Sequence, residues 1–142
     1  MSILTQSAAL VRRSCARLLA QDCLLCGAES GDNLLCPACE NDLPRLATAR
    51  CPRCALPTPG GEVCGRCLAR LPHYDATLAV FRYGFPIDKL VQSFKYGHRL
   101  ALGSYFGRQL VAQTGRCAAD LLIPMPLHPQ RLRERGFNQA LE

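Results

Sequence analysis

Two stretches with one cysteine frame decide the fold of the first half: CLLCGAESGDNLLCPAC (residues 23–39) and CPRCALPTPGGEVCGRC (residues 51–67). Each holds two Cys-x-x-Cys pairs separated by nine residues. A pair can point both sulfurs at one metal ion from a tight turn, and two pairs supply the tetrahedral ligand set that suits Zn²⁺. The spacing therefore predicts two zinc ions, one held by Cys23, Cys26, Cys36 and Cys39 and the other by Cys51, Cys54, Cys64 and Cys67.

Other uses of these cysteines remain open at this point. Disulfides would need an oxidising compartment, and an iron site or iron–sulfur cluster uses the same four sulfurs. A thioredoxin-like redox role needs one dithiol, whereas this chain has four pairs. Ligands of one set could also combine with those of the other set. Cys15 and Cys117 lie next to apolar segments and are interpreted as packed thiols.

The composition explains why metal is needed and limits what the charge can mean. The 142 residues are 49% hydrophobic and 20% charged, which is typical of a globular chain. Residues 23–67 are rich in glycine and proline and show little apolar periodicity, so this segment needs staples in place of a core. The formal net charge is +6. Eight thiolates and two Zn²⁺ ions lower it by about four, so overall basicity does not argue for nucleic-acid binding.

The apolar pattern predicts three regions. Residues 1–20 are expected to form an amphipathic helix, 21–70 a double zinc ribbon, and 71–142 the first half of an α/β domain. In that last region we expect strands at 76–84 and 119–127, a helix over 86–113 broken near Gly97 or Gly103, and a helix beginning in RGFNQALE. Strands alternating with helices predict a parallel sheet. The chain shows neither a secretory signal nor a membrane span, so we expect a cytoplasmic protein.

An arginine-rich patch follows the second expected strand, in HPQRLRERGFNQ (residues 128–139). If this segment is an extended loop, Arg131, Arg133 and Arg135 share one face and converge on an anion. The alternative is a solvated loop. Ligands of open α/β folds bind at the carboxyl ends of strands, and this position favours an anionic ligand.

The chain resembles the ComF family in its double cysteine array, in FKYGHR (residues 94–99) and in IPMPLHPQRLRERGFNQA (residues 123–140). The resemblance implies a double zinc ribbon followed by a type I phosphoribosyltransferase-like domain. It also implies a role in DNA uptake during natural transformation, with single-stranded DNA and a competence helicase as partners. A phosphorylated sugar or nucleotide is the implied ligand, and Mg²⁺ with phosphoribosyl pyrophosphate is expected only for the full-length family member.

The resemblance also implies which residues contact that ligand. They are Lys95, Pro126, Leu127, His128, Arg133, Arg135, Gly136 and Asn138. Arginine forks bind phosphate, lysine offers a point charge, and Asn138 either binds a ribose hydroxyl or caps a helix.

One part of the family pattern is missing. Phosphoribosyltransferases carry an acidic pair followed by Thr-Thr-Gly, and neither Asp-Asp nor Thr-Thr-Gly occurs in these 142 residues. We therefore expect a truncated chain with an incomplete parallel sheet and no transferase activity.

Two functions other than catalysis stay open. One is a zinc-ribbon module that binds single-stranded nucleic acid or a helicase partner through Arg50, Arg53, Arg66 and Arg70, with Tyr74 and Phe81 as stacking residues. The other is a purely structural scaffold, in which the ribbons dock the head of the protein on its body.

Overall fold

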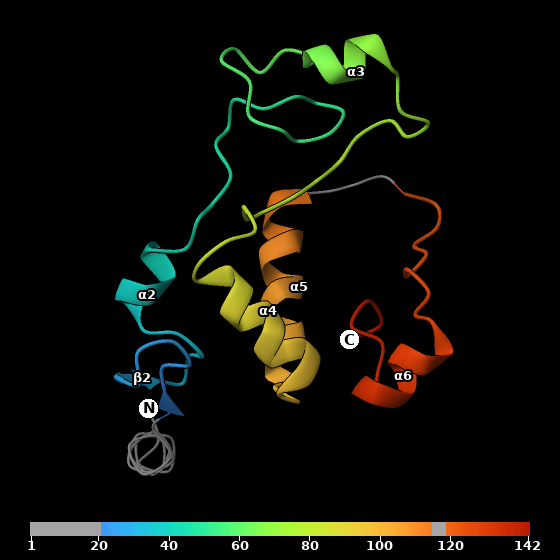
Figure 1. Ribbon diagram of the computed structural model, residues 1–142. Coiled ribbons are helices and arrows are strands. Elements are labelled where there is room, and N and C mark those ends of the chain that lie inside the picture. Colours follow the sequence, from blue (N-terminus) through green and yellow to red (C-terminus); the bar gives the residue numbers. More distant parts are fainter. Residues whose placement is uncertain (1–20, 115–118) are drawn as a thin grey trace, which may run out of the picture. The chain divides into compact units, whose positions relative to one another are not determined.

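The computed structural model describes residues 21–114 and 119–142 (Figure 1). The chain divides into two compact units, Met1–Leu43 and Pro44–Glu142. Each unit contains one of the two cysteine sets. The helix expected at 1–20, with Cys15, and the position of Cys117 lie outside the described residues.

The first unit is a small hairpin followed by a short helix. Strand β1 (Gln21–Asp22) pairs antiparallel with β2 (Glu29–Gly31), and helix α2 spans Pro37–Asn41. The buried Ser30 hydroxyl lies 2.8 Å from the Gln21 carbonyl oxygen and 2.6 Å from that of Asn33. It therefore ties the start of the hairpin to the chain that leaves it.

The second ribbon begins the second unit and is joined to the segment that follows it. Helix α3 spans Gly65–Ala69. Before the ribbon, the Leu46 amide donates to the Val80 carbonyl over 2.9 Å and the Arg82 amide donates to the Pro44 carbonyl over 2.8 Å. These bonds hold residues 44–46 antiparallel to residues 80–82, with an isolated bridge between Arg45 and Phe81.

A helical pair forms the main apolar core of the second unit. Helix α4 spans Ile87–Tyr96 and α5 spans Ala101–Thr114. Their buried apolar side chains are Ile87, Leu90, Phe94, Leu102 and Tyr105. The expected break falls after α4, at Gly97, and α5 runs through Gly103 without interruption. A Cβ at Gly103 would lie 3.2 Å from the Phe94 ring, so glycine here lets the two helices approach closely.

The C-terminal segment differs from the prediction. Helix α6 spans Pro129–Arg135 and ends at Gly136, whose φ of 78° is left-handed. The expectation of a helix beginning in RGFNQALE is wrong, because this glycine terminates a helix there. Phe137 packs on Phe94 of α4, with ring centroids 5.5 Å apart.

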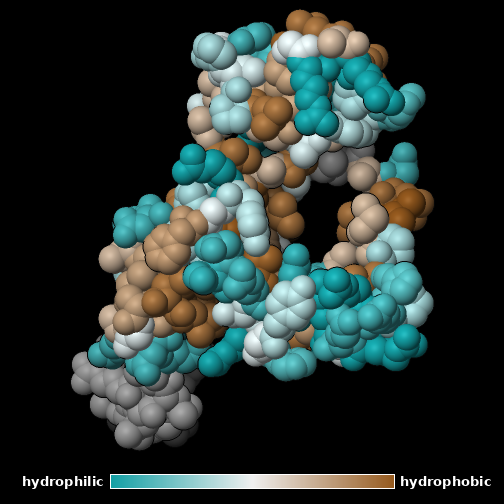
Figure 2. Space-filling view, in the orientation of Figure 1, coloured by the Kyte–Doolittle hydropathy of each residue, from teal (hydrophilic) through white to brown (hydrophobic). Residues whose placement is uncertain are grey.

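The predicted strands at 76–84 and 119–127 do not form in the described structure. Among the described residues, β1 and β2 make the sheet that is present, and it is antiparallel. Leu122 is 92% exposed and Ile123 is 75% exposed, and Figure 2 shows this apolar segment uncovered ahead of α6. A strand needs a neighbouring strand to satisfy its backbone, and this segment has none in the part of the chain that the structure describes. The parallel sheet stays a prediction.

No helix within the described ranges is long and apolar enough to cross a membrane.

Candidate metal centres and ligand residues

The structure brings the eight predicted cysteines together in two groups of four, each from one set. Within each group all four sulfurs lie within 4.8 Å of one another. The Cys26 and Cys36 sulfurs are 3.7 Å apart, and those of Cys54 and Cys64 are 3.6 Å apart. A tetrahedral Zn²⁺ with Zn–S bonds of about 2.3 Å requires sulfurs separated by about 3.8 Å. Both groups therefore fit one zinc ion each.

The first pair of each set sits in a tight knuckle. The Cys23 amide donates to the Ala28 carbonyl over 2.7 Å, and the Gly27 amide donates to the Cys23 carbonyl over 2.9 Å. In the second set the Cys51 amide donates to Leu56 over 2.8 Å, and the Ala55 amide donates to Cys51 over 2.9 Å. The repeated cysteine frame thus folds into a repeated backbone turn.

The second pair of each set lies on a short helix. Cys36 and Cys64 are the residues before the first turn of α2 and α3, with extended backbone conformations. Cys39 and Cys67 follow three positions later, and this separation puts both sulfurs of a pair on the same side of a helix. Pro37 suits the first helical position because it lacks an amide hydrogen.

Backbone amides stabilise one thiolate in each group. Burial would raise the pKa of the Cys23 thiol, but hydrogen bonds from backbone amides, beginning with that of Cys36, lower this pKa to about 6. In the second group burial is again outweighed by backbone amides, beginning with that of Cys54, and the pKa of Cys51 falls to about 6. Each group therefore offers a ready anionic ligand near neutral pH.

One further sulfur in each group holds its proton more tightly in the absence of a cation. Hydrogen bonds with the Cys26 and Cys36 side chains raise the pKa of Cys39 above its usual range. Burial, together with hydrogen bonds to its neighbouring thiols, raises the pKa of Cys67 to about 12. Four sulfurs at this separation cannot all be thiolates unless a cation lies among them, and Zn²⁺ supplies that charge.

The geometry does not fit disulfides or mixed sets. The eight described cysteines are free thiols, and the 3.6 and 3.7 Å sulfur separations far exceed a disulfide bond of about 2.05 Å. Each group also draws all its ligands from one set.

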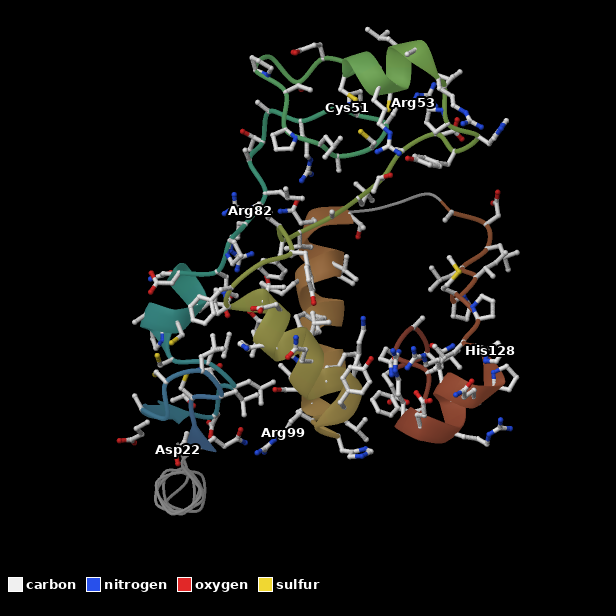
Figure 3. All side chains as sticks on the ribbon, viewed as in Figure 1. Asp22, Cys51, Arg53, Arg82, Arg99 and His128 are labelled. Carbon is white, nitrogen blue, oxygen red and sulfur yellow. The ribbon has the colours of Figure 1, made fainter. Side chains whose placement is uncertain are left out.

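Two of the arginines predicted to bind nucleic acid instead donate hydrogen bonds to backbone carbonyls of the protein. Arg53 donates to the carbonyl oxygens of Tyr74 and Asp75 over 3.2 and 3.0 Å, and its guanidinium lies 3.4 Å from the Asp75 carboxylate. Arg50 donates to the Ala79 carbonyl over 3.0 Å. Figure 3 shows Cys51 and Arg53 close to α3. Sequence reasoning missed this role because the carbonyls are more than twenty residues away.

The three arginines of the C-terminal patch do not line one face. They lie on helix α6, where alternate residues point in different directions, so the expected extended loop is wrong. Arg131 pairs with Glu134 over 2.9 Å. Arg135 donates to the Tyr96 hydroxyl over 3.1 Å and lies over its ring. Arg135 thus joins α6 to α4.

The remaining predicted ligand residues lie around this junction. The His128 ring nitrogen accepts from the Gln130 amide over 3.2 Å and caps the start of α6, where Figure 3 shows it. Asn138 donates to the Met125 carbonyl and accepts from the Ala140 amide, both over 3.1 Å. It therefore organises a turn and does not cap a helix. Lys95 is half-buried in the last turn of α4, and Arg133 is exposed.

The other two predicted ligand residues, Pro126 and Leu127, precede α6 and lie between Met125 and His128. The Asn138–Met125 bond therefore holds their loop against the turn that follows α6. Gly136 supplies that turn with its left-handed conformation.

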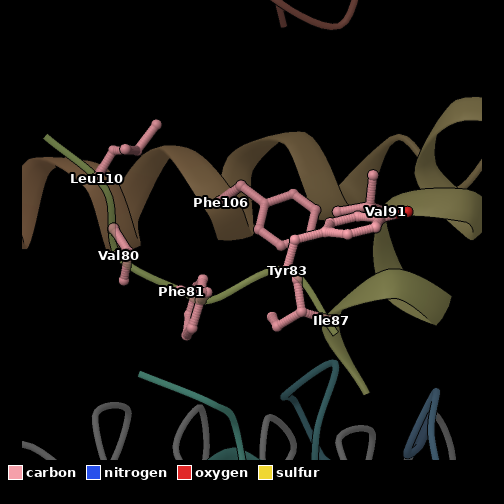
Figure 4. Close-up of a pocket in the computed structure, with 7 residues that line it drawn as sticks. All are labelled: Val80, Phe81, Tyr83, Ile87, Val91, Phe106 and Leu110. Atoms are coloured by element: carbon pink, nitrogen blue, oxygen red, sulfur yellow. The ribbon is translucent and has the colours of Figure 1, made fainter. Parts of the chain in front are cut away.

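A pocket of about 290 Å³ lies between α4, α5 and residues 80–83 (Figure 4). Its lining is apolar: Val80, Phe81, Tyr83, Ile87, Val91, Phe106 and Leu110. No charged side chain lines it, so it offers nothing to a phosphate. Phe81, which was predicted to stack on nucleic acid, instead lines this pocket and packs against Arg45, whose guanidinium carbon lies 5.2 Å from the ring centroid.

Comparison with known proteins agrees with this geometry. Residues 15–68 match the family described as "Double zinc ribbon domain". The DNA utilization protein YhgH of Shigella flexneri is 31% identical over 114 residues, covering 75% of this chain and 50% of that protein. Competence protein ComFC of Bacillus subtilis is 27% identical over 118 residues, covering 77% and 49%. Competence protein F of Haemophilus influenzae is 31% identical over 84 residues, covering 54% and 37%.

The chain spans about half the length of the curated relatives it matches first. No solved structure matches it. The zinc ribbon match covers both four-sulfur groups, and the relatives carry the names of competence and DNA utilization proteins. The chain therefore belongs to the ComF family, whose double zinc ribbon it carries.

Proposed function

We propose that this chain acts in the handling of DNA during uptake, with a zinc-ribbon head and a body that binds a phosphorylated ligand. The observation that carries the proposal is the pair of four-sulfur groups in a chain whose relatives are named for competence and DNA utilization. Thiolate ligands of this kind persist in a reducing compartment, so we place the protein in the cytoplasm.

The body would contact a phosphorylated sugar or nucleotide through Lys95 and Arg133. Neither side chain has a polar partner within the described residues, whereas Arg135 and Asn138 are occupied in joining α4, α6 and the loop before it. Arg135 and Asn138 would therefore position the ligand loop. The acidic pair and Thr-Thr-Gly of phosphoribosyltransferases are not in this sequence, so binding without transfer is the activity we propose for the chain itself.

Phosphoribosyl pyrophosphate with Mg²⁺ tests this ligand role. We expect a rise in Tm that the Lys95→Ala and Arg133→Ala changes reduce, and no release of pyrophosphate. Lys89→Ala, an exposed lysine of α4, is the matched control. Pyrophosphate release by the purified chain would contradict binding without transfer, and an unchanged Tm would remove the ligand role.

The second candidate function is a ribbon module that binds single-stranded DNA or a helicase partner without catalysis. It is favoured by a basic and aromatic pocket beside the second zinc site, lined by Arg66, Arg70 and Tyr74 among others. Titration of a labelled oligonucleotide at several salt concentrations tests it, because phosphate contacts make affinity fall steeply with salt. Absence of binding at low salt would leave the structural scaffold as the role of the ribbons.

A further inference from the structure

A pocket of about 580 Å³ opens beside the second cysteine group. It is lined by Cys54, Leu56, Arg66, Cys67, Arg70, Leu71, Pro72, His73 and Tyr74. Helix α3 forms one wall and the chain that leaves this helix forms another. The volume lies in the range of pockets that hold small organic ligands.

Two arginines line this pocket, and their guanidinium groups are exposed. Arg66 is the second residue of α3, Arg70 directly follows the last residue of this helix, and both line the pocket. Both are exposed and lack an ion-pair partner within the described residues. The carboxylate that follows the pocket in sequence, Asp75, is already paired with Arg53. Two guanidiniums are therefore free to bind phosphate.

The apolar surface beside these charges is also exposed. Tyr74 is 49% exposed and Leu71 is 64% exposed. Figure 2 shows apolar and polar side chains next to each other over α3. The Tyr74 backbone is held by Arg53, which fixes the position from which its ring projects. An aromatic ring beside two arginines fits a ligand that has a flat base and a phosphate.

We propose that this pocket binds a nucleotide of single-stranded DNA, with the base against Tyr74 and Leu71 and its phosphate at Arg66 and Arg70. A zinc ion with four thiolates leaves two negative charges behind the pocket. The phosphate therefore belongs at the exposed guanidiniums and the neutral base nearer the sulfurs. This inference rests on the proposed DNA role and assigns it to one ribbon.

The test uses the full zinc-loaded chain and a fluorescein-labelled oligodeoxythymidylate, with affinity measured by anisotropy. The variants are Tyr74→Ala, Tyr74→Phe and the double change Arg66→Gln with Arg70→Gln. The control is Arg82→Gln with Arg108→Gln, which removes the same charge from exposed positions outside the pocket.

We expect Tyr74→Ala to weaken binding by about 5- to 150-fold and Tyr74→Phe to retain it, because stacking needs the ring and not the hydroxyl. The arginine double change should lower the salt slope by about 1.4, since each phosphate contact on a single strand contributes about 0.7. The control should leave the slope unchanged.

Three results would overturn the assignment. One is a Tyr74→Ala affinity equal to that of the parent chain. Another is a control variant as weak as the arginine double variant. The third is loss of zinc from the arginine variant, which would mean that the guanidiniums balance the metal site. If the parent chain binds no oligonucleotide at all, the proposal that the ribbons contact DNA is wrong as well. If the parent chain binds DNA but Tyr74→Ala does not weaken the binding, only the assignment to this pocket is wrong.

Discussion

The two knuckles use a left-handed residue at the same position, and the residue differs. Gly27 has a φ of 71° and Ala55 has a φ of 60°. A side chain in this conformation costs roughly 1–2 kcal/mol, whereas glycine adopts it freely. The free-energy cost of this left-handed conformation can therefore be measured by introducing a side chain in Gly27→Ala and by removing one in Ala55→Gly.

The structure gives the magnitudes. A Cβ at Gly27 would meet nothing within 4 Å, so alanine there neither clashes nor packs. The strain of roughly 1–2 kcal/mol is offset by about 0.4–1 kcal/mol from the less flexible unfolded chain, leaving a destabilisation of about 0.8 kcal/mol. Metal binding is coupled to folding of the site, so zinc affinity of the first site should fall about fourfold.

The reverse change should be nearly neutral. Ala55→Gly relieves the strain but makes the unfolded chain more flexible, and it removes a methyl group that is only 6% exposed. Removing the buried methyl group costs about 0.8 kcal/mol. The relieved strain therefore cancels the two destabilising effects to within about 1 kcal/mol. The asymmetry between the two variants is the expected signature.

Competition with a chromophoric zinc chelator measures both sites in one protein, and the unchanged site serves as the internal control. An unaltered first site in Gly27→Ala would refute the reasoning. So would an Ala55→Gly variant that gains more than about 2 kcal/mol, because the strain could not then be of the stated size.

Three further outcomes are expected. The first site should release zinc to a chelator before the second, because Cys26 is exposed whereas the four cysteines of the second site are buried or half-buried. Simultaneous release from both sites in a time course would contradict this. Zinc affinity should fall more steeply with falling pH below about 6 than above it, because the metal-free thiols of Cys23 and Cys51, whose pKa is lowered to about 6, then also bind protons that zinc must displace. An affinity that falls with the same slope above and below pH 6 would oppose this prediction. Arg53→Ala should speed proteolysis within residues 74–79, because it removes the hydrogen bonds to the Tyr74 and Asp75 carbonyls. The free energy of unfolding should change by less than about 1 kcal/mol, because the Arg53–Asp75 ion pair is solvent-exposed. An unchanged cleavage rate would show that the Arg53 hydrogen bonds do not hold this segment.

The metal centres could be predicted from the sequence because their geometry is local. A Cys-x-x-Cys pair spans one turn, and nine residues suffice to bring two pairs together, so the spacing predicted two groups of four sulfurs. The structure then excluded groups that mix the two sets. The sequence predicted a helix break near Gly97 or Gly103, and the structure places it at Gly97. A Cβ there would lie 2.7 Å from the Ser93 carbonyl oxygen, one turn earlier in the same helix.

Contacts between distant residues were decided by tertiary structure alone. Nothing near Arg53 in the sequence marks the Tyr74 and Asp75 carbonyls as its partners, and Arg135 gives no sign of Tyr96. The apolar run at 121–125 has the composition of a buried strand, yet a strand exists only where another strand pairs with its backbone. Sequence therefore determined the zinc ligands, because the spacing of neighbouring residues carries that information. Which arginines are free for a ligand depended on how separate segments pack.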